Sequence, residues 1–120
     1  MKLTQQENID HVVRLDVSGS LDFHQLSPLD EPLSDVLGHD AYKKTVIMNM
    51  RAVDTLDSSG VGWLLTCQKQ FRSSGGSLVL HSLSPTARNV LRVLNLQRVL
   101  RLADDEKQAI VLTEAGESSG

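Results

Sequence analysis

Polar and apolar residues alternate near the start of the chain, over residues 11–17 (HVVRLDV). A period of two predicts a β-strand that buries one face and leaves the other in water. Residues 3–6 have weaker strand character, and the polar residues 6–10 between the two segments are expected to form the turn of a hairpin. Gly19 and Ser20 are expected to end the second strand.

The segment from residue 21 to residue 44 has the least regular pattern. Several leucines and a valine have helical spacing there, yet Pro28 and Pro32 fall among them. A proline in a helix interior costs about 3 kcal/mol. We therefore expect a helix that begins late, near Glu31, with Pro32 in its first turn and Gly38 as its stop.

Beyond this segment, short apolar runs alternate with amphipathic ones. The run 45–50 (TVIMNM) predicts a buried strand, and a polar break follows at 54–60. Apolar residues then recur at helical spacing from Val61 to Phe71. Two serines and two glycines at 73–76 are expected to end that helix.

A second strand and helix follow in the same order. Residues 78–80 predict another buried strand, and Ser84 followed by Pro85 indicates an N-cap with proline in the first helical position. Residues 99–102 are expected to form an edge strand, and the acids at 104–106 favour the start of a last helix. Alternating strands and helices predict parallel pairing, with the opening hairpin as an antiparallel edge. We expect an α/β domain whose mixed, mostly parallel central sheet has four to five strands and about four helices.

Length and composition agree with one domain. The chain has 120 residues, of which 40% are hydrophobic and 3% aromatic. That length suffices for a single hydrophobic core. We assign the domain to residues 1–115 and expect residues 116–120 to form a disordered tail. No apolar run approaches the ~18 residues of a membrane span, and the first residues lack the apolar core of a signal peptide. A single cysteine, Cys67, fits a reducing compartment, so we expect a cytoplasmic protein.

The net charge of -3 gives no basic footprint for nucleic-acid binding. Arg88, Arg92, Arg98 and Arg101 could form a local basic patch, or simply a solvated helix face and strand flank.

The segment with the most specific chemistry is 56–62 (LDSSGVG), between a buried strand and an amphipathic helix. Its four small residues leave no bulk over the helix start, and Gly60 and Gly62 allow another backbone to approach closely. The first N–H groups of a helix have no internal partner and carry positive potential. Such a helix start accommodates an anion.

Together with 46–50 (VIMNM), 75–80 (GGSLVL), 84–85 (SP) and 19–22 (GSLD), this segment resembles the STAS domain family. The resemblance covers nearly the whole chain and is closest to the bacterial anti-sigma-factor antagonists. The sequence departs from that family at Ser20, where glutamate is frequent, in the proline-containing segment, and at a bulky tryptophan after the loop.

The resemblance implies a phosphorylation-controlled switch that regulates transcription. In that family the first serine after the aspartate is phosphorylated by an anti-sigma factor that is itself a serine kinase of the histidine-kinase-like ATPase type. The unmodified protein binds the anti-sigma factor and frees the sigma factor, and a PP2C-type phosphatase resets the switch. Carried onto this chain, the acceptor is Ser58, Asp57 and Ser59 flank it, and Gly60 and Gly62 permit docking.

Each of these residues also has a plainer interpretation. Ser58 could be an unmodified helix cap, Asp57 could itself cap the helix, and Ser59 has the same hydroxyl chemistry as Ser58. Trp63 could anchor a partner or sit at the edge of the core. At the level of function, the alternatives are a STAS module that binds a nucleotide or small anion, and an unmodified subunit of a signalling assembly.

An enzyme is not expected. Ser58 is not in a G-x-S-x-G elbow, and neither a phosphate-binding nor a dinucleotide-binding glycine pattern is present. His11, His24, His39 and His81 have no metal-ligand spacing. The sequence therefore predicts a binding module without metal or cofactor.

Overall fold

A computed structural model describes the backbone of residues 2–21 and 32–119 and the side chains of residues 2–21 and 33–114. The expected helix start at Glu31, together with Asp22, His24 and Pro28, lies outside these residues, and the expected end of the domain at 115 stays a prediction. The elements, in chain order, are β1 (Lys2–Gln5), β2 (Val12–Leu21), α1 (Pro32–Leu37), the 3-10 turn η1 (Ala41–Lys43), β3 (Thr45–Leu56), α2 (Ser58–Ser74), β4 (Ser77–His81), α3 (Pro85–Val93), the 3-10 turn η2 (Leu96–Arg98), β5 (Leu102–Ala103) and α4 (Glu106–Ser119).

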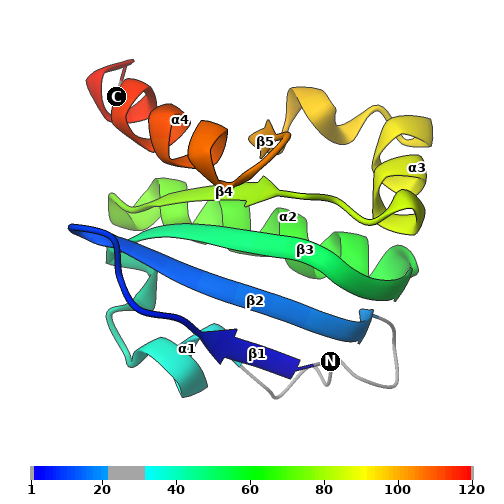
Figure 1. The fold of residues 1–120 in the computed structure, drawn as a ribbon, viewed down its shortest axis with the longest axis horizontal. Coiled ribbons are helices and arrows are strands. Elements are labelled where there is room, and N and C mark those ends of the chain that lie inside the picture. Colours follow the sequence, from blue (N-terminus) through cyan, green and yellow to red (C-terminus); the bar gives the residue numbers. More distant parts are fainter. Residues whose placement is uncertain (1, 22–31, 120) are drawn as a thin grey trace.

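The five strands form one sheet in the order β1-β2-β3-β4-β5 (Figure 1). β1 pairs with β2 antiparallel, and the three remaining pairs are parallel. The predicted α/β domain with a mixed, mostly parallel sheet is thus confirmed, as is the opening hairpin. Because the parallel strands all end at the same edge of the sheet, the loops that follow β3 and β4 lie at that edge.

Alternate residues of β4 enter two separate cores. Leu78 and Leu80 belong to the larger core, which α1, α2 and α3 cover. Val79 points to the opposite face and packs with Ile47 and with Ala109 of α4. Helix α2 lies behind the strands in Figure 1, and its buried stripe holds it on the sheet. The helix is therefore a rigid support for the residues at its first turn.

Two strands are longer than their side-chain pattern predicts. We expected β2 to end at Gly19 and Ser20 and the next strand to end at Met50, but pairing continues to Leu21 and Leu56. The register shifts beside Gly19, whose φ of +87° is left-handed, so the ladder resumes after an irregularity. Backbone pairing thus extends through polar residues, and the ends of β2 and β3 both lie at the start of α2.

The edge strand β5 lies further along the chain than the predicted 99–102. The N–H groups of Val99 and Leu100 both donate to the carbonyl of Leu96. These bonds close a turn, so the two residues have no free N–H for the sheet. Only Leu102 and Ala103 pair with β4.

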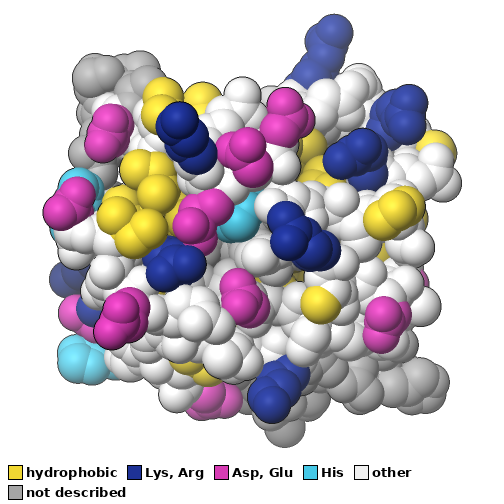
Figure 2. Space-filling model, viewed as in Figure 1, with side chains coloured by type: hydrophobic (Ala, Val, Ile, Leu, Met, Phe, Trp, Pro, Cys, Tyr) yellow, Lys and Arg dark blue, Asp and Glu magenta, His cyan; other side chains and the backbone are white. Residues whose placement is uncertain are grey.

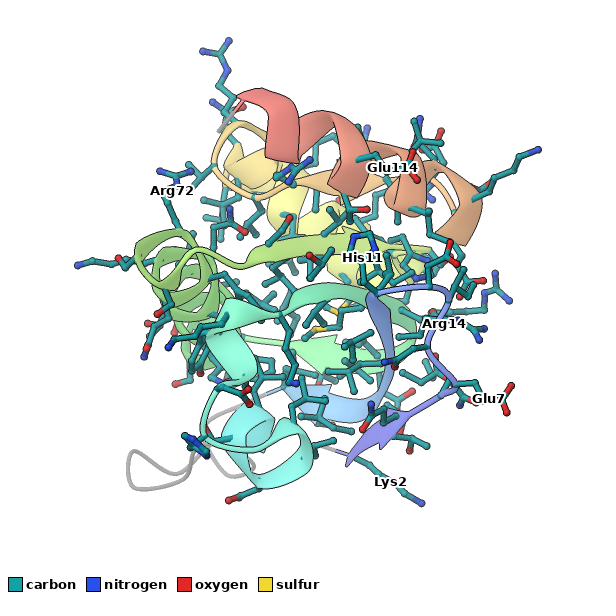
Figure 3. The ribbon with its side chains drawn as sticks, turned by 90° about the vertical axis from the view of Figure 1, so that its left-hand side faces the viewer. Lys2, Glu7, His11, Arg14, Arg72 and Glu114 are labelled. Carbon is teal, nitrogen blue, oxygen red and sulfur yellow. The ribbon has the colours of Figure 1, made fainter. Side chains whose placement is uncertain are left out.

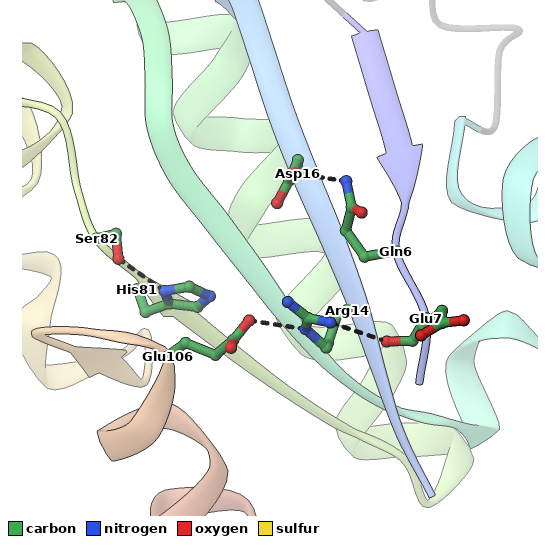
Figure 4. Close-up of polar contacts among 7 residues, drawn as sticks. All are labelled: Gln6, Glu7, Arg14, Asp16, His81, Ser82 and Glu106. Carbon is green, nitrogen blue, oxygen red and sulfur yellow. Dashed lines mark hydrogen bonds and ion pairs between the residues drawn. The ribbon is translucent and has the colours of Figure 1, made fainter. Parts of the chain in front are cut away.

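Three polar residues lie side by side on neighbouring strands of the sheet. Asp16, Asn49 and His81 are register partners on β2, β3 and β4. Nearby, the Arg14 guanidinium donates to Glu106 at 2.8 Å and so ties β2 to α4 (Figure 4). His81 is 2% exposed. Burial lowers the pKa of its imidazole, although the carboxylates of Glu106 and Asp16 oppose that shift.

Candidate functional site

The site lies where β3 ends and α2 begins. Asp57 has extended backbone (φ -103°, ψ -173°), and its Oδ1 accepts a hydrogen bond from the Gly60 N–H at 3.0 Å. Asp57 is therefore the N-cap, as one of the sequence-based alternatives proposed. The other alternative, a cap formed by Ser58, is wrong, because Ser58 is the first residue inside the helix.

The two serines of the segment differ in exposure. Ser58 is exposed, while Ser59 is only partly exposed. Ser58 is therefore the more accessible of the two hydroxyl groups. Both lie in the first turn of a 17-residue helix, where backbone N–H groups lack helical partners.

Gly60 faces inward. A Cβ atom at this position would meet the carbonyl oxygen of Leu21 at 2.2 Å and the side chain of Leu56 at 2.7 Å. The same Leu21 carbonyl accepts a hydrogen bond from the Asp57 N–H at 3.2 Å. The backbone that approaches Gly60 is thus the end of this chain's own β2.

Gly62 and Trp63 complete the expected site. Gly62 is exposed, and a Cβ atom there would meet nothing within 4 Å. Trp63 is partly buried and packs against the larger core. Its Nε1 is buried and has no hydrogen-bond partner among the described residues. The surface of the tip is therefore formed by Asp57, Ser58 and Gly62, with Trp63 at its margin.

Sequence reasoning missed Leu21 as a member of the site. Its contribution is a backbone carbonyl, which any residue type supplies, so side-chain pattern gave no signal. The neighbouring Gly19 was the available hint, because a left-handed residue lets β2 bend and continue.

The structure offers neither a metal site nor a membrane span within its described residues. Among the residues that the structure describes, no three or more His, Cys, Asp or Glu side chains are grouped so as to hold a metal ion. Within the same residues, every helix is too short or too polar to cross a bilayer.

A sequence profile of the STAS domain matches residues 2–109. The chain belongs to the STAS domain family. The match includes every strand, the helix tip and the glycines that follow α2, so it confirms the resemblance found in the sequence.

Solved structures of anti-sigma-factor antagonists have the same fold as this STAS domain. A Thermotoga maritima protein, provisionally described as such an antagonist, is 23% identical with a TM-score of 0.79, over 93% of this chain and 94% of that one. An antagonist from Mycobacterium paratuberculosis is 20% identical with a TM-score of 0.71, over 94% and 95%. The Bacillus cell fate determinant SpoIIAA, in its phosphorylated form, is 27% identical with a TM-score of 0.62, over 91% and 96%.

Proposed function

We propose that this STAS protein is an anti-sigma-factor antagonist whose binding is controlled by phosphorylation of Ser58. The observation that carries the proposal is the exposure of Ser58 at the first position of α2, directly after the capping Asp57. The Bacillus relative, whose structure was determined in a phosphorylated form, supports it, since a protein of this fold can carry the modification.

The partners in this proposal are an anti-sigma factor that is also a serine kinase, of the histidine-kinase-like ATPase type, and a PP2C-type phosphatase. The unmodified protein binds the anti-sigma factor in the cytoplasm and so frees a sigma factor for transcription. The protein acts as a binding module and not as an enzyme, and it needs no cofactor.

The proposed interface is the surface of the helix tip. Asp57, Ser59 and Gly62 surround the acceptor, and Trp63 adds apolar area at the margin. Gly60 contributes indirectly, because its lack of a side chain lets β2 and α2 meet. The absence of bulk at Gly62 leaves room for a partner's backbone.

Charge gives the switch its physical basis. A phosphate on Ser58 adds about -1.5 to -2 charges beside the carboxylate of Asp57. Two charges ~5 Å from a carboxylate of the partner, at an effective dielectric of ~20, give roughly 6–7 kcal/mol of repulsion before screening. Screening reduces this several-fold, yet about 1.4 kcal/mol already weakens binding tenfold. Phosphorylation can thus release a partner without refolding the domain.

The anion-binding alternative is disfavoured by the same cap. A nucleotide phosphate at this helix start would compete with Asp57 for the Gly60 N–H and would meet its negative charge. The remaining alternative is an unmodified subunit of a signalling assembly, which would have a structural role and in which Ser58 would never be phosphorylated.

The acceptor is tested by mass spectrometry after incubation with the partner kinase and ATP. Wild type and Ser59→Ala should each gain one phosphate that maps to residue 58, and Ser58→Ala should gain none. Ser59→Ala is the matched control, since it removes the neighbouring hydroxyl from the same helical turn. Equal labelling of the Ser58→Ala variant would exclude Ser58 as the acceptor.

A further inference from the structure

A second surface of the protein, independent of the proposed switch, lies between α3, η2 and β5. A cavity of about 240 Å³ opens there to solvent. Its walls come from three aliphatic residues, two arginines and one glutamine: Leu83, Leu91, Leu102, Arg88, Arg92 and Gln97. We call this surface the α3 groove. It contains no carboxylate.

Exposed apolar side chains occur in the same stretch of the chain as the residues of the α3 groove. Val93 is 73% exposed, Leu94 52% and Val99 48%. Val93 follows the lining residue Arg92, and Val99 lies two positions after Gln97. Three of the five large hydrophobic residues exposed in the described part of the chain are therefore within residues 93–99, which overlap the groove in sequence. The groove itself has aliphatic walls that open to solvent, as expected of an interaction surface.

The rim of the α3 groove is basic, although the whole chain carries a net charge of -3. Arg88 and Arg92 lie one helical turn apart on α3, and Arg98 lies in η2. All three are exposed, and none forms an ion pair with another described residue. In Figure 2, Lys and Arg side chains gather at the upper right over α3 and η2, next to hydrophobic ones.

Arg101 does not belong to this rim. Its guanidinium donates to the Ser77 hydroxyl at 3.0 Å and to the Leu112 carbonyl. Of the four arginines that could form a basic patch, one therefore braces β4 and α4 instead, and two of the other three, Arg88 and Arg92, line the groove.

We propose that the α3 groove binds an acidic amphipathic segment of a protein partner. An aliphatic side chain of that segment enters the hollow against Leu83 and Leu91, and flanking carboxylates pair with Arg88 and Arg92. Charge complementarity selects this occupant, because aliphatic walls bind an aliphatic side chain while paired guanidinium groups select carboxylates.

In this proposal the partner segment binds as an amphipathic helix, whose apolar face lies in the α3 groove. The residues of the α3 groove on α3 and η2 are distinct from those at the tip of α2. The segment could therefore bind whether or not Ser58 carries a phosphate.

The test is an NMR titration of the isotope-labelled full chain with a short synthetic helical peptide. The peptide carries leucines on one face and glutamates on both sides of them. Amide shifts should be confined to residues 83–102, and the affinity should fall as salt is raised. Peptides with lysine in place of glutamate, or alanine in place of leucine, should bind at least tenfold more weakly.

Two variants locate the site. The double variant Arg88→Glu with Arg92→Glu should weaken the peptide about tenfold or more, because two attractive charge pairs become repulsive. The matched control is Lys69→Glu with Arg72→Glu, two exposed cations one turn apart on α2, which should change little. Arg72 is labelled beside α2 in Figure 3.

Several results would overturn the proposal. Equal binding of the lysine peptide, shifts outside residues 83–102, or equal losses in the two double variants would each exclude the α3 groove as an acidic-peptide site. Tighter binding to anionic lipid vesicles than to the peptide would assign the surface to a membrane. Concentration-dependent dimerisation that Arg88→Glu with Arg92→Glu abolishes would assign it to a second copy of this chain.

Discussion

A Cβ atom on Gly60 would lie 2.2 Å from the carbonyl oxygen of Leu21. The last residue of β2 therefore rests on the third residue of α2, and the Asp57 N–H donates to the same carbonyl. These contacts fix the first turn of α2 against the sheet. The exposed Ser58 thus sits on a rigid tip whose shape does not depend on a partner.

Gly60→Ala should destabilise the protein by about 1–3 kcal/mol, because the added methyl group overlaps backbone that has little freedom to move. Urea denaturation should show a lower midpoint with an unchanged slope.

Gly62→Ala is the matched control for that change. It adds the same methyl group two residues further along α2, where nothing lies within 4 Å. Alanine favours the helix over glycine, so the variant should be unchanged or up to about 1 kcal/mol more stable. A loss at Gly62 equal to that at Gly60 would contradict the packing described at the tip.

Asp57→Ala should cost about 1 kcal/mol of stability, since the Gly60 N–H loses its acceptor. Asp57→Asn keeps a capping oxygen and should retain most of that stability. Thermal unfolding of the three proteins at neutral pH separates the cap from the charge, and an equal loss in both variants would show that the carboxylate charge matters more than the hydrogen bond.

His81 should make stability depend on pH. Its pKa is lower in the folded protein than in the unfolded chain, because burial disfavours the imidazolium. The unfolded chain then binds more protons, so stability is fully present above the ordinary histidine pKa of about 6.5 and is lost as pH falls below it. The midpoint temperature of thermal unfolding should decrease as the pH is lowered from 7 to 5. In His81→Gln that decrease should be smaller, and an identical decrease would remove His81 as its source.

The fold was largely predictable because side-chain patterns report burial. The helix that ends at Gly75 (φ +89°) and the helix capped by Ser84 were both expected, since glycine and serine supply chemistry that these ends require. Backbone pairing was not predictable. β2 extends to Leu21, and the Leu96 carbonyl closes a turn where an edge strand was expected. Hydrogen bonds between backbone carbonyl and amide groups determine both features, and side-chain patterns do not report them.

The candidate site divides in the same way. Ser58 was singled out by the resemblance to the STAS family, because the local sequence left Ser59 open as well, and the exposed position of Ser58 agrees with that choice. The inward direction of Gly60 followed from the place of Leu21, which belongs to a strand far away in sequence. A local motif therefore indicated which residues form the tip, but only the fold separated those that face outward from those that support them.

The proposed switch requires that a phosphate on Ser58 releases the partner. The direct measurement is calorimetric titration of the kinase-type anti-sigma factor with the unmodified protein and with the protein phosphorylated at Ser58. Phosphorylation should weaken binding at least tenfold, or by about 1.4 kcal/mol. Equal or tighter binding of the phosphorylated protein would contradict it.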